Sequence, residues 1–189
     1  MRRLSQCLLI GSFTAFSWLA MQVAHELGHV IGAWATGGEV VKVVLSPTVL
    51  SHTDVAPNPH PLIVVWAGPV VGCLLPLVAF LAAASAACPG IYLFRFFAGF
   101  CLVANGVYIA GGSFLNGADP GDMMRCGSPQ WSLILFGLIA VPIGLLMWHR
   151  QGVHFGLAKS QGKVHPIATV ASLGLLVTLV LAEVIYSGR

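Results

Sequence analysis

Five long apolar stretches constrain the fold of this chain more than any other feature of its sequence. A helix needs about 20 mainly apolar residues to cross the hydrocarbon core of a bilayer. Stretches of this kind occupy residues 7–35, 61–86, 91–115, 130–148 and 166–186. The chain as a whole is 57% hydrophobic and only 8% charged, far from the average of a soluble domain. The sequence therefore predicts an all-α polytopic membrane protein with about five transmembrane helices.

The segment between the first two apolar stretches has a different character. A β-branched run at residues 40–45 resumes at 48–50 after a short break, which predicts a short β-hairpin or a bent strand between helices 1 and 2. The polar residues 51–60 that follow contain two prolines and are typical of a surface loop. Three residues of this loop could imitate metal ligands but match no zinc-binding spacing: His52, Asp54 and His60.

The first apolar stretch contains a polar cluster, His25-Glu26-Leu27-Gly28-His29, which is an HExxH pattern. Residues four apart lie on one face of a helix, so His25 and His29 can present two imidazoles to one Zn²⁺ while Glu26 serves as a general base. Chance would give on the order of one such match in two hundred chains of this composition. Since each charged group near the bilayer centre costs roughly 2.5 to 3.5 kcal/mol, a functional site is favoured over a hydrogen-bonded histidine pair in a packing face.

A catalytic zinc site normally takes a third protein ligand, and counting helices indicates where it originates. The first and third helices run parallel, so their far ends lie at the same membrane surface, where Asp119 and Asp122 follow the third helix. With a rise of about 1.5 Å per residue, His29 lies roughly 9 Å inside the end of its helix, so the acidic segment must dip inward. Glycine and proline around the two acids allow such a re-entrant segment, and both aspartates stay open as ligands.

These motifs resemble the site-2 protease family of intramembrane zinc metallopeptidases. The HELGH sequence at 25–29 is similar to the family's HExxH helix, and Ala67-Gly68-Pro69 is similar to its AGP element. The sequence PGDMMR at 120–125 resembles the segment that carries the family's third zinc ligand, although two methionines replace its paired glycines. The resemblance covers about residues 20–125 and favours Asp122 as the third ligand, with Asp119 as the alternative.

The resemblance implies a zinc metalloendopeptidase that hydrolyses peptide bonds in or near transmembrane segments of membrane proteins. Glu26 would be the catalytic residue, and His25, His29 and Asp122 (or Asp119) would bind Zn²⁺; no substrate-binding residue is indicated. We expect residues 1–189 to form a single membrane-embedded metallopeptidase domain with its core at 20–125 and two further helices at 130–148 and 166–186. The alternative is a non-catalytic membrane-embedded homologue that binds a membrane partner. A histidine-bound iron oxidoreductase would need several histidine boxes, and only one is present.

The charged residues restrict the partners and leave the orientation open. The net charge is only +3 and the Lys and Arg residues are scattered, so no basic stripe predicts nucleic-acid binding. We expect the lipid bilayer and a membrane-protein substrate as partners, in a bacterial cell membrane. The distribution of Lys and Arg favours a site on the extracytoplasmic side, whereas the resemblance implies a site nearer the cytoplasm. Residues 149–165 are predicted to form a solvated basic connector.

Overall fold

The predicted helices are present in a computed structural model that describes residues 2–115 and 117–187. Within these described residues, five helices are long and apolar enough to cross a membrane: α1 (Arg2–Thr36), α2 (Pro61–Ser85), α3 (Ile91–Gly112), α5 (Gln130–Trp148) and α6 (Pro166–Ser187). Their bounds agree with the apolar stretches to within a few residues, except that α1 begins earlier. The prediction of a polytopic helical membrane protein is confirmed.

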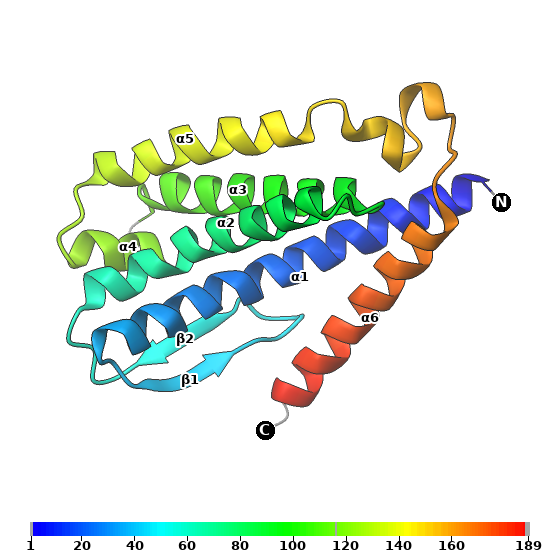
Figure 1. The fold of residues 1–189 in the computed structure, drawn as a ribbon. Helices are drawn as coiled ribbons and strands as arrows, with labels where there is room; N and C mark the ends of the chain where they lie inside the picture. Colours follow the sequence, from blue (N-terminus) through cyan, green and yellow to red (C-terminus); the bar gives the residue numbers. More distant parts are fainter. Residues whose placement is uncertain (1, 116, 188–189) are drawn as a thin grey trace.

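The helices pack in an order that differs from their order in the chain. Helix α5 packs on α3, α3 on α2, α2 on α1, and α6 on the other side of α1 (Figure 1). A short helix, α4 (Ala118–Arg125), lies between α3 and α5 in the chain and packs against α2 and α3. Its Met123 is fully buried in a hydrophobic cluster with Val65, Ile109 and Leu133, which holds α4 against the helix bundle.

Helices α1 and α2 approach closely at Gly28, inside the HExxH pattern. A Cβ atom at this position would lie 2.3 Å from the backbone oxygen of Ala67 and 2.8 Å from Gly68 Cα. Gly32, one turn later, also faces Ala67. Small residues four apart allow the backbones of two membrane helices to meet in this way. The close contact fixes the position of the two histidines along the axis of α1 relative to α2.

Replacement of Gly28 by alanine is therefore expected to destabilise the protein. The new methyl group meets backbone atoms, which cannot rotate away, so the free energy of unfolding should fall by about 1–3 kcal/mol. Thermal unfolding in detergent measures the loss. Gly11→Ala on the same helix is the matched control, because nothing lies within 4 Å of its Cβ position. Equal melting temperatures for the two variants would contradict the close approach.

The hairpin between α1 and α2 is confirmed, but its second strand lies later than predicted. Strand β1 (Val40–Val44) pairs antiparallel with β2 (His52–Val55), with Val44 opposite His52. Residues 48–50, the expected second strand, form the turn region instead, and part of the predicted loop 51–60 is the strand. Hydrogen bonds from this polar segment to α1, described below, give the physical reason: they place residues 51–53 beside α1.

The prediction of a solvated connector at 149–165 was partly wrong. This segment contains two short 3-10 helices, η1 (Gln151–Phe155) and η2 (Ala158–Ser160). Phe155 is buried and packs with Leu9 and Phe13 of α1, while Gln6 donates a hydrogen bond to its carbonyl oxygen at 3.2 Å. The segment has four large apolar side chains (Val153, Phe155, Leu157 and Val164), and nothing in the sequence singles out Phe155 as the one that anchors the segment to the beginning of α1.

Candidate active site

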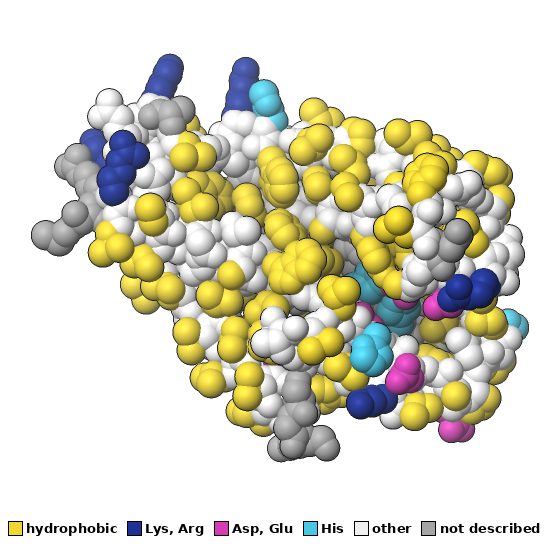
Figure 2. All heavy atoms as spheres, turned by 180° about the vertical axis from the view of Figure 1, so that it is seen from behind, with side chains coloured by type: hydrophobic (Ala, Val, Ile, Leu, Met, Phe, Trp, Pro, Cys, Tyr) yellow, Lys and Arg dark blue, Asp and Glu magenta, His cyan; other side chains and the backbone are white. Residues whose placement is uncertain are grey.

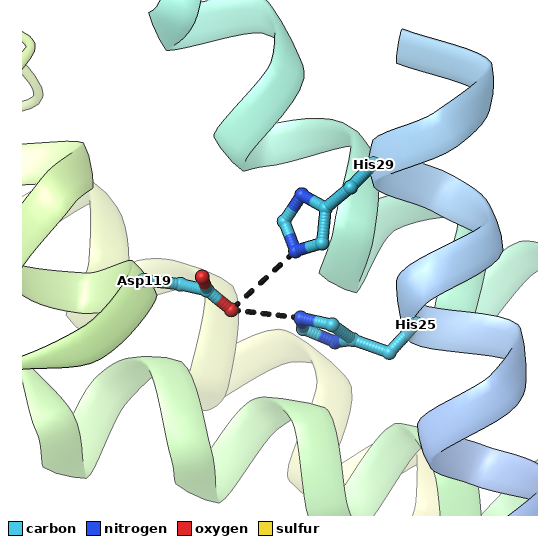
Figure 3. Close-up of side chains that lie close together, drawn as sticks. All are labelled: His25, His29 and Asp119. Atoms are coloured by element: carbon cyan, nitrogen blue, oxygen red, sulfur yellow. Dashed lines mark hydrogen bonds and ion pairs between the residues drawn. The ribbon is translucent and has the colours of Figure 1, made fainter. Parts of the chain in front are cut away.

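Helices α1 and α4 bring two imidazoles and one carboxylate together. Asp119 Oδ2 lies 2.8 Å from His25 Nε2 and 3.5 Å from His29 Nε2. One ligand atom from each residue lies within 4.8 Å of the others, and both rings point toward the carboxylate (Figure 3). The histidines are buried and the Asp119 side chain is 25% exposed. Two imidazole nitrogens with one carboxylate oxygen form a donor set used by catalytic zinc sites.

The remaining ring nitrogens of the two histidines are bound to other atoms of the protein. His29 Nδ1 lies 2.9 Å from the carbonyl oxygen of Val64, which can only accept, so this nitrogen donates. His25 Nδ1 lies 2.7 Å from Asn105 Oδ1, and Asn105 Nδ2 donates to the carbonyl oxygen of Cys101 at 2.9 Å. Both contacts allow the neutral ring to keep its proton on Nδ1, so that Nε2, which faces Asp119, is the atom that would bind a metal ion in place of its hydrogen bond to the carboxylate. The surroundings of the histidines therefore fit zinc.

Asn105→Leu is expected to weaken zinc binding by roughly 10- to 100-fold, because His25 loses the acceptor that orients its ring. Titration of the purified protein with a competing zinc chelator measures the change. Gln151→Leu is the matched control: it also removes a buried amide, but this amide bonds the carbonyl oxygen of Met147, and neither Gln151 nor Met147 lines the cavity of the site. If both variants bind zinc as tightly as the wild type, Asn105 does not orient His25.

Glu26 follows His25 on α1, and two hydroxyl groups hold its side chain. Its side chain is buried, with only 4% of the residue exposed. Ser51 Oγ donates to Glu26 Oε1 at 2.8 Å, and Thr53 Oγ1 donates to Oε2 at 2.7 Å. These bonds satisfy a carboxylate that would otherwise be buried without partners. The general-base candidate is thus ordered by the hairpin.

A cavity of about 850 Å³ gives access to these groups. Residues from α1, β2, α2, α3, α4 and α5 line it, among them His25, His29, Glu26 and Asp119. Away from the polar groups its wall is apolar and includes Trp18, Phe100, Val103 and Trp148. On this face of the molecule histidine and acidic side chains gather in a hollow among hydrophobic ones (Figure 2). A peptide and a water molecule can therefore meet at the polar end of the cavity.

The structure separates the two candidate aspartates. Helix α4 begins at Ala118, so Asp119 lies in its first turn, beside the histidines. Asp122 lies about 4.5 Å farther along the helix. It lines the cavity but forms an exposed ion pair with Arg125 and does not belong to the converging group. The sequence favoured Asp122 by its register, whereas the structure brings the alternative, Asp119, to His25 and His29.

The electrostatics of Asp119 suit a metal ligand. Burial raises the pKa of the Asp119 carboxyl, but hydrogen bonds and charge from His25 and His29 outweigh burial and hold this pKa below its ordinary value. The Tyr108 hydroxyl lies 3.3 Å from Asp119 Oδ2 and 3.3 Å from its backbone nitrogen. The carboxylate is therefore ionised near neutral pH and held from two sides.

Several residues of the site were missed by sequence reasoning. Asn105, Tyr108, Ser51 and Thr53 reach the site from α3 and from the hairpin. Asn105 carried a usable signal, since it is a polar residue inside an apolar helix. The loop residues His52, Asp54 and His60 are not in the converging group that the described residues form.

Comparison with known proteins gives a family for the chain. A family model described as Peptidase M50B-like matches residues 7–110, more than half of the 189 residues. The match contains His25, Glu26 and His29 as well as the hairpin, and it ends before Asp119. No curated protein and no solved structure gives a significant match. The matched region contains an HExxH helix, and the described part of the chain has five helices long and apolar enough to span a membrane, so this integral multi-pass membrane protein belongs to the Peptidase M50B-like family, consistent with its resemblance to the site-2 proteases.

Proposed function

We propose that the protein is a zinc endopeptidase that hydrolyses peptide bonds in or near transmembrane segments of other membrane proteins. One observation carries this proposal: Nε2 of His25, Nε2 of His29 and Oδ2 of Asp119 converge in a cavity that also contains Glu26. We assign these three residues as zinc ligands, with Asp119 preferred to Asp122, and Glu26 as the general base. The family match supports the protease class.

The protein's own residues account for most of the proposed mechanism. When bound, zinc supplies a Lewis acid that lowers the pKa of water and polarises a peptide carbonyl. Glu26 would accept a proton from the attacking water and pass it to the leaving amine. Ser51 and Thr53 hold the Glu26 carboxylate, while Asn105 holds the ring of His25.

The surroundings of the site support a membrane-embedded substrate. The carbonyl groups of a transmembrane helix are hydrogen-bonded within the helix, so such a substrate must unwind before cleavage. Apolar residues on the cavity wall, among them Trp18 and Phe100, would accept its side chains. An edge of the hairpin could pair with the extended backbone, as sheet edges do with peptides. The bilayer and a membrane-protein substrate are thus the partners we propose.

Metal analysis together with a cleavage assay tests the proposed function. The full chain is purified in detergent and assayed with a labelled peptide that contains one transmembrane helix interrupted by Gly and Pro. We expect about one zinc per chain, loss of cleavage after chelation, and recovery on addition of zinc. Absence of zinc from the purified protein would overturn the proposal. Stoichiometric zinc without cleavage would favour the non-catalytic homologue.

A further inference from the structure

The hairpin meets the site at the beginning of β2. Besides the two hydroxyl bonds to Glu26, the backbone nitrogen of Ser51 donates to Gln22 Oε1 at 3.1 Å. Gln22 and Glu26 are four residues apart and so lie on one face of α1. One face of α1 therefore binds residues 51–53 through three hydrogen bonds, two of which end on the carboxylate of the general base.

The alternation of β2 matches this contact. Ser51 directly precedes β2 and is two residues from Thr53; both side chains reach the Glu26 carboxylate and so lie on the same side of this segment. Both are half-buried, whereas His52 and Asp54 are exposed. Within the described part of the chain, none of the three hydrophobic core clusters includes a hairpin residue. Three hydrogen bonds to α1, together with pairing to β1, hold this strand at the site.

The same contacts restrict Glu26. A glutamate side chain has three rotatable bonds, and a single partner would leave its second oxygen unrestrained. Here each carboxylate oxygen has its own hydroxyl donor, at 2.8 and 2.7 Å. Each oxygen also keeps a lone pair that can accept a proton, because an ionised carboxylate offers about four acceptor positions. The two hydroxyls fix the carboxylate without blocking it.

We propose that Ser51 and Thr53 are positioning residues, which orient the general base and make cleavage depend on the docking of the hairpin on α1. This inference rests on the proposed function, since it takes Glu26 as the base. The hydroxyls act through Glu26 and not on the metal ligands, because their side-chain hydrogen bonds end on its carboxylate.

The test is a Ser51→Ala/Thr53→Val double variant of the full chain, assayed with the interrupted-helix peptide in detergent. Misplacement of a catalytic group by about 1 Å can cost 10²-fold, so we expect kcat to fall roughly 10- to 100-fold. Zinc content should equal that of the wild type, because the zinc ligands are not altered. The loss should lie in kcat, and KM should rise as well only if an edge of the hairpin also pairs with the substrate. The single variant Thr53→Ser keeps a hydroxyl and should retain most of the activity.

A matched control removes the same atoms elsewhere in the hairpin. In the turn, the hydroxyls of Ser46 and Thr48 lie 3.1 Å from each other and are exposed. Ser46→Ala/Thr48→Val should therefore keep the wild-type kcat. A similar loss of kcat in this control would show that hairpin stability alone matters, and would overturn the proposal. An unchanged kcat in the Ser51/Thr53 variant, or a raised KM alone, would overturn it as well.

Hydrogen exchange gives a readout that does not depend on activity. Amides of residues 51–55 should exchange faster in the Ser51/Thr53 variant and in Glu26→Ala than in the wild type, and at the wild-type rate in the turn control. Unchanged exchange in both variants would show that these hydrogen bonds do not dock the hairpin, and the inference would fail. If the wild type cleaves nothing, the proposed function fails instead, and exchange still decides whether Glu26 holds the hairpin.

Discussion

A Glu26→Gln variant is expected to retain zinc and to lose cleavage by roughly 10²- to 10⁴-fold, the usual contribution of a general base. Glutamine has the same shape as glutamate, and its carbonyl oxygen can still accept one of the two hydroxyl hydrogen bonds, but its amide cannot take a proton from water. Because Glu26 is outside the converging group of His25, His29 and Asp119, the metal ligands are unchanged. Single-turnover cleavage and metal content measure the two effects separately.

Glu39→Gln is the control for loss of a negative charge next to the hairpin. Glu39 is exposed just before β1, and its backbone groups bond those of Ala56 and Pro57, so its side chain is free to change without disturbing these bonds. The control should cleave at the wild-type rate. Cleavage by Glu26→Gln at the wild-type rate would refute the role of Glu26 and, with it, the metalloprotease mechanism.

The second large effect is expected for Asp119→Ala. Loss of a ligand should weaken zinc binding by more than the roughly 10- to 100-fold seen when a residue that only orients a ligand is removed. Asp122→Ala breaks only the exposed ion pair with Arg125, a kind of contact that contributes at most about 1 kcal/mol to stability. It should therefore leave zinc binding intact. Competition with a chelator of known zinc affinity measures both variants.

The pair of variants decides between the two aspartates. If zinc is lost in Asp122→Ala and kept in Asp119→Ala, the third ligand is Asp122, as the resemblance of the sequence favoured. A third variant, Tyr108→Phe, removes the hydroxyl that contacts Asp119 and keeps the ring edge against His25. Only a small loss of zinc affinity is expected for Tyr108→Phe. The comparison therefore separates removal of the ligand Asp119 from removal of a hydroxyl group that contacts it.

The helices could be predicted from the sequence because each apolar stretch is long enough to require a membrane or a deep core. The hairpin could be predicted only in part. Residues 40–45 have β-branched side chains that favour a strand, whereas His52-Thr53-Asp54-Val55 has a mixed composition typical of a loop. Its strand geometry depends on pairing with β1 and on hydrogen bonds from Ser51 and Thr53 to Gln22 and Glu26, which lie 25 to 29 residues away in the sequence.

In the candidate site too, the residues that are close in sequence could be predicted, whereas the contacts between distant residues could not. His25, Glu26 and His29 are close in sequence, so helical spacing alone places them on adjoining faces. The choice between Asp119 and Asp122 depends on where α4 begins and on how it docks against α3, where Gly112 faces the ring of Pro120. Asn105 contacts a residue 80 positions away, which no local pattern can indicate.

The close approach of α1 and α2 has a consequence for the transfer of this site to other scaffolds. The HExxH pattern leaves its third and fourth residues unspecified, but in this protein their surroundings differ. Leu27 is 38% exposed, whereas Gly28 lies against the backbone of α2. If the five residues were grafted into an isolated helix, the spacing of the two histidines would be kept, but the contact with α2 that fixes their position along the helix would be lost. Transfer of the histidine pair therefore requires α2 as well as α1, with glycine at position 28, in addition to the segment that carries Asp119.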